Sequence, residues 1–147
     1  MIKTYGLTHI VLAVRDVNRS LRFYQQVLGV VEVYRSDGFI QAQTPGSRDV
    51  LVFEENVEHA GAAGGVAHFG FRLLDPGDID AAAAAVERAG GKISSKGEFC
   101  PGEPFVFFSD PDGYEVEIWY ELPTAVDPPA APHTSRGTKR RRPKRDA

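Results

Sequence analysis

The chain has 147 residues, of which 42% are hydrophobic, a formal net charge of −3 and a single cysteine. That length suits one domain with a hydrophobic core of its own, and one cysteine excludes an internal disulfide framework. No apolar run approaches the roughly 18 residues of a membrane span and the N-terminus lacks a signal peptide's apolar region, so we expect a cytoplasmic protein that does not bind membranes.

The charge is divided unevenly along the chain. Residues 1–122 hold 10 Lys and Arg against 18 Asp and Glu, net −8, whereas residues 123–147 hold 7 against 2, net +5. The Pro-, Ala- and Arg-rich composition of 123–147 predicts a disordered tail. Its run TKRRRPKR has the charge to contact nucleic acid, but the acidic remainder would repel phosphate groups, and we favour a solvated extension.

Within residues 1–122 one pattern occurs twice. A strand-like segment carrying His9 is followed seven residues later by Asp16, and a second carrying His68 is followed seven residues later by Asp75. Apolar residues then recur at helical spacing until a glycine, which predicts a helix in each half with the aspartate as its N-cap. The expected apolar stripes are Val17, Leu21, Tyr24 and Leu28 in the first helix and Ile79, Ala82, Val86 and Ala89 in the second.

Three strand-like segments follow each helix, separated by turn residues such as SDG, TPGS and DPDG. They lie at 30–35, 39–44 and 49–55 in the first half, and at 92–96, 105–109 and 114–121 in the second. Strands and turns in this order predict an α+β domain, residues 1–122, built of two βαβββ modules at 5–55 and 66–122.

Alternation along the strands brings three potential metal ligands to equivalent positions. Successive strand side chains point to opposite faces, and the apolar ones mark the face that the helices cover. His9, His68 and Glu117 all fall on the other face. Two imidazoles and a carboxylate leave further positions of a divalent ion open, so we predict one ion per site, with Fe, Mn, Ni, Zn and Co all compatible.

The chain resembles the vicinal oxygen chelate superfamily of glyoxalases, bleomycin-resistance proteins and extradiol dioxygenases. The resemblance covers residues 5–122 and rests on LTHIVLAVRDVNRSLRFYQQVLG, VAHFGFRL and FSDPDGYEVEIW. It implies an open, cup-shaped, mixed eight-stranded β-barrel with helices packed outside, in a protein that forms a homodimer. It also implies that His9, His68 and Glu117 bind the metal of an enzyme acting on a small oxygen-rich or electrophilic metabolite or xenobiotic, which chelates the ion through two oxygens.

Six residues are expected to have roles in catalysis or substrate binding around this ligand set. Glu117 and His59 are the candidates for catalysis, His59 because it lies in a Gly-rich linker from which an imidazole could carry protons. Arg72 and Glu115 share strand faces with the ligands and are candidates for contacting substrate. Phe107 and Trp119 are the candidate aromatic contacts.

The resemblance leaves several chemistries open. Relatives of glyoxalase I take a fourth ligand, a glutamate, from the strand at 49–55, where this chain places Leu51 or Val52, and Glu54 would serve only after a shift of register. Many extradiol dioxygenases have an acid/base tyrosine at the position of Phe107. Both departures put those two reactions in doubt.

Two alternatives use different parts of the same fold. Thiol transferases that confer fosfomycin resistance resemble this chain in length, in their three-ligand site and in the DPDG turn, and they need cations for a phosphonate. The cations available here are Arg35, Arg72 and Lys96. A non-catalytic, bleomycin-resistance-type protein would instead hold a drug in an apolar groove lined by Phe105, Phe107, Trp119 and Tyr34.

Overall fold

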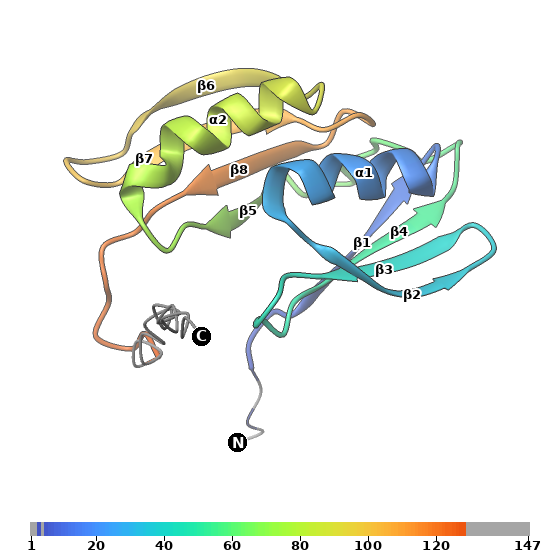
Figure 1. Cartoon of the computed structure of the whole chain (residues 1–147), viewed down its shortest axis with the longest axis horizontal. Coiled ribbons are helices and arrows are strands. Elements are labelled where there is room, and N and C mark those ends of the chain that lie inside the picture. Colours follow the sequence, from blue (N-terminus) through green and yellow to red (C-terminus); the bar gives the residue numbers. More distant parts are fainter. Residues whose placement is uncertain (1–2, 4, 129–147) are drawn as a thin grey trace, which may run out of the picture.

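The computed structural model describes residue 3 and residues 5–128 of the chain (Figure 1). The first half contains β1 (His9–Val14), α1 (Val17–Leu28), β2 (Val31–Ser36), β3 (Phe39–Gln43) and β4 (Val50–Glu55). The second contains β5 (Phe69–Arg72), a 3-10 turn (Pro76–Asp78), α2 (Ile79–Arg88), β6 (Lys92–Glu98), β7 (Pro104–Ser109) and β8 (Glu115–Trp119). The predicted βαβββ order is therefore present in both halves.

Each half forms its own four-stranded mixed sheet. The strand order is β1-β4-β3-β2 in the first sheet and β5-β8-β7-β6 in the second. β1 runs parallel to β4, as β5 does to β8, and the remaining neighbours are antiparallel. The two halves thus repeat one topology, as the repeated sequence pattern predicts.

The described strands remain two separate sheets, so one chain by itself does not form the predicted eight-stranded cup. α1 packs on β3 and β4, α2 packs on β6, β7 and β8, and the two helices also touch each other. Figure 1 shows the helices as neighbours on the same side of the molecule. The helices therefore do not cover the outside of a single cup. They meet where the two modules join, because the buried apolar side chains of one module pack against those of the other.

The first helix begins and ends as predicted. The Asp16 carboxylate accepts hydrogen bonds from the backbone N–H groups of Asn18 and Arg19, and Gly29 closes the helix with a φ of 69°. In the second half the Asp75 carboxylate caps the 3-10 turn through Gly77 N, and α2 begins only at Ile79. A Pro-Gly pair is a poor start for an α-helix, since glycine carries a large conformational entropy cost.

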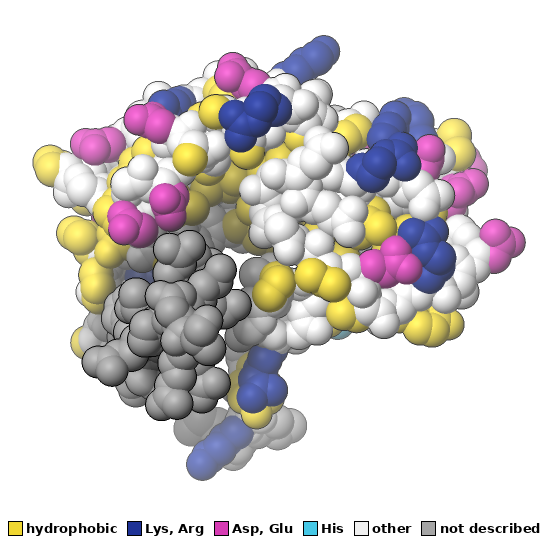
Figure 2. Space-filling model, in the orientation of Figure 1, with side chains coloured by type: hydrophobic (Ala, Val, Ile, Leu, Met, Phe, Trp, Pro, Cys, Tyr) yellow, Lys and Arg dark blue, Asp and Glu magenta, His cyan; other side chains and the backbone are white. Residues whose placement is uncertain are grey.

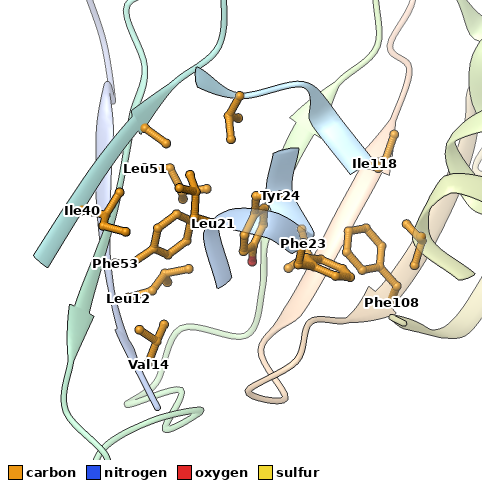
Figure 3. Close-up of a cluster of buried hydrophobic side chains, with 14 of the residues drawn as sticks. Leu12, Val14, Leu21, Phe23, Tyr24, Ile40, Leu51, Phe53, Phe108 and Ile118 are labelled. Atoms are coloured by element: carbon orange, nitrogen blue, oxygen red, sulfur yellow. The ribbon is translucent and has the colours of Figure 1, made fainter. Parts of the chain in front are cut away.

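A single hydrophobic core extends through both modules. Tyr24 of α1 stacks on Phe53 of β4 within the first module, with ring centroids 5.4 Å apart. Phe23, next to it in the chain, reaches Phe108 of β7 in the second module, 6.1 Å between centroids. Figure 3 shows this row of rings passing from one module to the other. The modules are therefore packed by the same kind of contact that stabilises each of them.

The DPDG turn between β7 and β8 also joins the modules. The Asp112 side chain is fully buried and accepts hydrogen bonds from Arg15, Arg19 and Ser20 of the first module. The Asp110 carboxylate accepts one from the Tyr24 hydroxyl at 2.9 Å. Buried carboxylates are tolerated where they are paired in this way, so the turn predicted from its sequence is also an intermodule connection.

The described chain continues six residues beyond the predicted domain end at 122. Asp127 accepts hydrogen bonds from Arg72 and from the backbone and hydroxyl of Thr124. The rest of the predicted tail, 129–147, lies outside the described residues. Neither α-helix in 5–128 is long and apolar enough to cross a membrane.

Candidate metal centre

Two of the three predicted ligands lie together on the second sheet. His68 stands just before β5, Glu117 lies in β8, and the pairing of Gly70 with Glu117 brings the two strands side by side. His68 Nε2 is 3.3 Å from Glu117 Oε2. Two donors that each bind one ion at about 2.1 Å stand roughly 3 Å apart, so this pair has the spacing of ligands to a shared cation.

The Glu117 carboxylate has an unused ligand position. The residue is only 7% exposed, and its Oε1 is buried without a hydrogen-bond partner among the residues that the structure describes. Burial raises the pKa of this carboxyl above its usual range, an effect that His68 partly offsets. An unpaired buried oxygen costs free energy that a bound cation would recover, so the chemistry of this pair fits a divalent metal.

His9 lies apart from that pair. It begins β1, on the first sheet, and is exposed to solvent. Among residue 3 and residues 5–128, no three His, Cys, Asp or Glu side chains are grouped so as to hold a metal ion. One chain therefore brings together His68 and Glu117 but not the full predicted set of three.

The register of the first sheet explains why a fourth ligand is missing. Val11 pairs with Val52 in β1 and β4 as Gly70 pairs with Glu117 in β5 and β8. His9 and His68 each precede these positions by two residues, so Val52 is the counterpart of Glu117 in the first module. Glu54 shares the face of Val52 but pairs with Ala13 at the far end of β1, roughly 13 Å along the strand from the level of His9.

Arg72 is engaged by acidic groups in this structure. Its guanidinium donates hydrogen bonds to both carboxylate oxygens of Asp127 and to the backbone oxygen of Glu121, and it lies 3.5 Å from the Glu121 carboxylate. The pairing lowers the pKa of Asp127 to about 2. To contact a substrate anion, Arg72 would have to exchange these partners for it.

The two other polar candidates are exposed. Glu115 accepts a hydrogen bond from the Ser94 hydroxyl at 3.3 Å and lies on the same strand face as Glu117. His59 Nδ1 lies 3.2 Å from Asn56 Oδ1 in the linker. The structure therefore places Glu115 beside the ligand pair, and it gives His59 a neighbour within its own loop.

A cavity of about 340 Å³ opens beside His68, between the two sheets. β1, the linker at 61–67 and the start of β8 line it, and Tyr114 and Glu115 are among its polar walls. The Tyr114 hydroxyl donates to the backbone oxygen of Ala13, and burial raises the pKa of this phenol. We did not predict Tyr114 from the sequence, where it reads only as the first residue after a turn.

Aromatic side chains surround the ligand pair. The Phe107 ring meets His68 edge-on, with centroids 5.0 Å apart, and its residue pairs with Glu117 across β7 and β8. Trp119 follows two positions along on the same face of β8 and pairs with Phe105. Both predicted aromatic contacts, Phe107 and Trp119, therefore border the candidate site, and Phe107 offers no proton there.

The sequence matches the family model of the Glyoxalase/Bleomycin resistance protein/Dioxygenase superfamily over residues 6–118. Catechol-2,3-dioxygenase of Bacillus subtilis is 31% identical over 119 residues, which cover 78% of this chain and 41% of that protein. Lactoylglutathione lyase of Haemophilus influenzae is 29% identical over 128 residues, covering 76% of this chain and 90% of that protein. The chain thus spans less than half of the first relative.

Solved structures agree on the fold. The genomically encoded fosfomycin resistance protein of Listeria monocytogenes superposes with a TM-score of 0.68 at 21% identity, covering 83% of this chain and 96% of that one. A mutant of that protein, solved with Mn(II) and dihydroxypropylphosphonic acid, gives a TM-score of 0.64 at 20% identity and covers 79% of this chain and 90% of that one. With the family model matching 6–118, this chain belongs to the glyoxalase, bleomycin-resistance and dioxygenase superfamily.

Proposed function

We propose that the protein is a divalent-metal-dependent enzyme whose site is completed by a second copy of the chain. His68 and Glu117 of one copy and His9 of the other would hold one ion. The observation that carries this proposal is the His68–Glu117 pair, 3.3 Å apart, with a buried oxygen that has no partner. A pair so arranged offers two of the three ligands expected from the sequence.

The faces of the two sheets support a homodimer. Apolar side chains lie around His9 on the outer face of the first sheet, where Val11, Val31 and Tyr34 are 50%, 52% and 53% exposed. The corresponding face of the second sheet presents Phe105, Phe107 and Trp119, each partly exposed. Exposed apolar faces of this kind mark interaction sites, and each face carries the ligand that the other lacks. A second copy would supply each site with its missing ligand, and the apolar side chains around the ligands would then line a site between the two chains.

The bound ion would act as a Lewis acid that polarises substrate oxygens and stabilises negative charge developing on them. The chain's own groups have separate tasks. The aromatic residues beside His68 would exclude water and position the substrate, and Glu115, which shares the face of Glu117 and lines the cavity beside His68, would accept a proton. The substrate class we propose is a small oxygen-rich or electrophilic metabolite or xenobiotic.

Metal content tests the ligand set. We would purify the protein without an affinity tag, reconstitute it anaerobically with Fe, Mn, Co, Ni or Zn, and measure bound metal by mass spectrometry. His9→Ala, His68→Ala and Glu117→Ala should each lose the ion, whereas the control Asp37→Ala, at an exposed loop position, should retain it. A wild type that stays empty with every ion would refute the enzyme proposal and leave drug binding as the function to test.

Mixing two defective variants tests the dimer. After co-refolding, a heterodimer of His9→Ala and Glu117→Ala has one site with no defect and one with both, if each site takes ligands from two chains. Statistical mixing then restores about a quarter of the wild-type metal. If each site lies within one chain, the mixture binds none.

A further inference from the structure

We propose that the second sheet carries an aromatic floor which selects substrates with an uncharged, ring-bearing body. The floor consists of Phe99, Phe105, Phe107 and Trp119. This inference rests on the function proposed above, and it names the part of the substrate that lies beyond the two chelating oxygens.

The rings form a continuous series that starts at the ligand pair. Phe107 contacts His68 edge-on, Phe105 lies 5.6 Å from Phe107 between centroids, and Phe99 stacks on Phe105 at 4.3 Å. Phe99 directly follows β6, the other three residues come from β7 and β8, and strand pairing places those three on the face of Glu117. A molecule whose oxygens reach His68 and Glu117 would therefore have aromatic surface beside the rest of its body.

Two glycines let rings of the floor lie close against the sheet. A Cβ at position 97 would stand 3.3 Å from the Phe105 ring, and one at position 70 would stand 3.4 Å from Trp119 Nε1. The rings thus occupy space that any other residue would fill with its own side chain. Phe99 and Phe105 are nearly parallel, whereas Phe107 stands at 65° to Phe105, so an aromatic ligand would gain offset or edge-to-face contacts in addition to burial.

The charges around the floor disfavour an anionic substrate. Arg72 is paired with Asp127, Arg35 with Glu32 at 2.7 Å, and Lys96 with Asp80. On the opposite face, which carries the helices, Figure 2 likewise shows basic side chains beside acidic ones. Every cation predicted for a phosphonate pocket is therefore already neutralised, and Glu115 and Glu121 add negative charge to the two ends of β8.

A matched pair of ligands tests the floor. Benzohydroxamate and acetohydroxamate carry the same two-oxygen chelating group, and only the first has a ring. We would measure both by calorimetry with zinc-loaded and with metal-free protein, and would follow the emission of Trp119, the chain's single tryptophan. With zinc, benzohydroxamate should bind at least about tenfold more tightly than acetohydroxamate and should change the Trp119 emission. Phosphonoacetate, a chelator without a ring, should bind no more tightly than acetohydroxamate.

Variants locate the preference. Phe105→Ala and Phe105→Leu should reduce the ratio of the two affinities severalfold, and the exposed Phe99→Ala should reduce it less. Leu74→Ala removes an equally apolar side chain that is 99% exposed, and it should leave the ratio unchanged. Phe105→Leu keeps most of the apolar volume, so it separates the contribution of the ring from that of the fold.

The outcomes separate the two proposals. If both hydroxamates bind equally and only with zinc, the metal site stands and the floor is refuted. If benzohydroxamate is preferred, Phe105→Ala abolishes the preference and zinc raises the affinity of neither compound, the floor stands and the metal-dependent function fails. Absence of binding by either compound, or tighter binding of phosphonoacetate, overturns the floor.

Discussion

Replacing Glu117 by glutamine should make the metal-free protein more stable while removing its ability to hold metal. The side chain is 10% exposed, its Oε1 has no partner, and burial raises its pKa above the ordinary 4.5. Leaving a buried acceptor unsatisfied costs about 1–3 kcal/mol, and the ionised form costs more. Glutamine keeps the shape and discards the charge, so we expect a gain of about 1 kcal/mol at pH 7, or about 3 °C in Tm.

The raised pKa of Glu117 determines how the stability of the metal-free protein should change with pH. Because the folded pKa lies above the unfolded value, the folded state binds more protons between the two, and stability falls as pH rises through that window. Below about pH 4 both states are protonated and the advantage of Glu117→Gln should vanish. The advantage should be complete once the pH exceeds the raised pKa of the folded state.

Thermal unfolding in EDTA between pH 4 and 8 is the assay. Glu115→Gln is the matched control, since it changes the same charge at an exposed position of the same strand, and its free energy of unfolding should stay within about 0.5 kcal/mol of the wild-type value. A Glu117→Gln protein that melts below the wild type at pH 7, or a Tm difference that does not vary with pH, would show that the buried Glu117 carboxylate does not destabilise the folded state.

Three other substitutions test the packing that positions the site. Asp112→Ala should lower the free energy of unfolding in urea by about 3 kcal/mol, because it leaves Arg15, Arg19 and Ser20 without their shared buried partner. Gly91→Ala should cost about 1–3 kcal/mol in the same assay, since its Cβ would stand 2.7 Å from Val86 Cγ1. Val52→Glu should destabilise the protein in EDTA by several kcal/mol, and added Zn or Ni should raise its Tm more than that of the wild type. A neutral Asp112→Ala or Gly91→Ala, or a Val52→Glu Tm that metal does not raise, would contradict the respective reasoning.

The sequence was sufficient for what depends on local pattern. Helical spacing and the cap at Asp16 predicted α1, and alternation predicted which faces of β1 and β8 carry the buried apolar residues. The same alternation placed Glu117 beside His68, because both lie on the face away from the core. Periodicity carries this information reliably, since a strand that slipped by one residue would expose its whole apolar face.

The arrangement of the modules was beyond local pattern. The DPDG turn reads as a turn, and nothing in its four letters indicates that Asp112 accepts hydrogen bonds from Arg19, 93 residues earlier. The same holds for the contact of Phe23 with Phe108, which packs α1 against the second module. Pairings between distant segments depend on which apolar surfaces remain uncovered after each module has formed. The cup expected from the resemblance would require a different arrangement of the two modules within one chain.

The duplicated framework allows the site to be asymmetric. Val52 and Glu117 occupy the same place in the two modules, yet both are buried, at 4% and 7% exposure. Valine is at no disadvantage there, whereas glutamate pays for desolvation and leaves one oxygen unpaired. The same buried position therefore holds an ionisable side chain in the second module only, where it lowers the stability of the folded state. A cation shared with His68 is the group that would offset this cost, and in the proposed site the valine leaves three ligands rather than four.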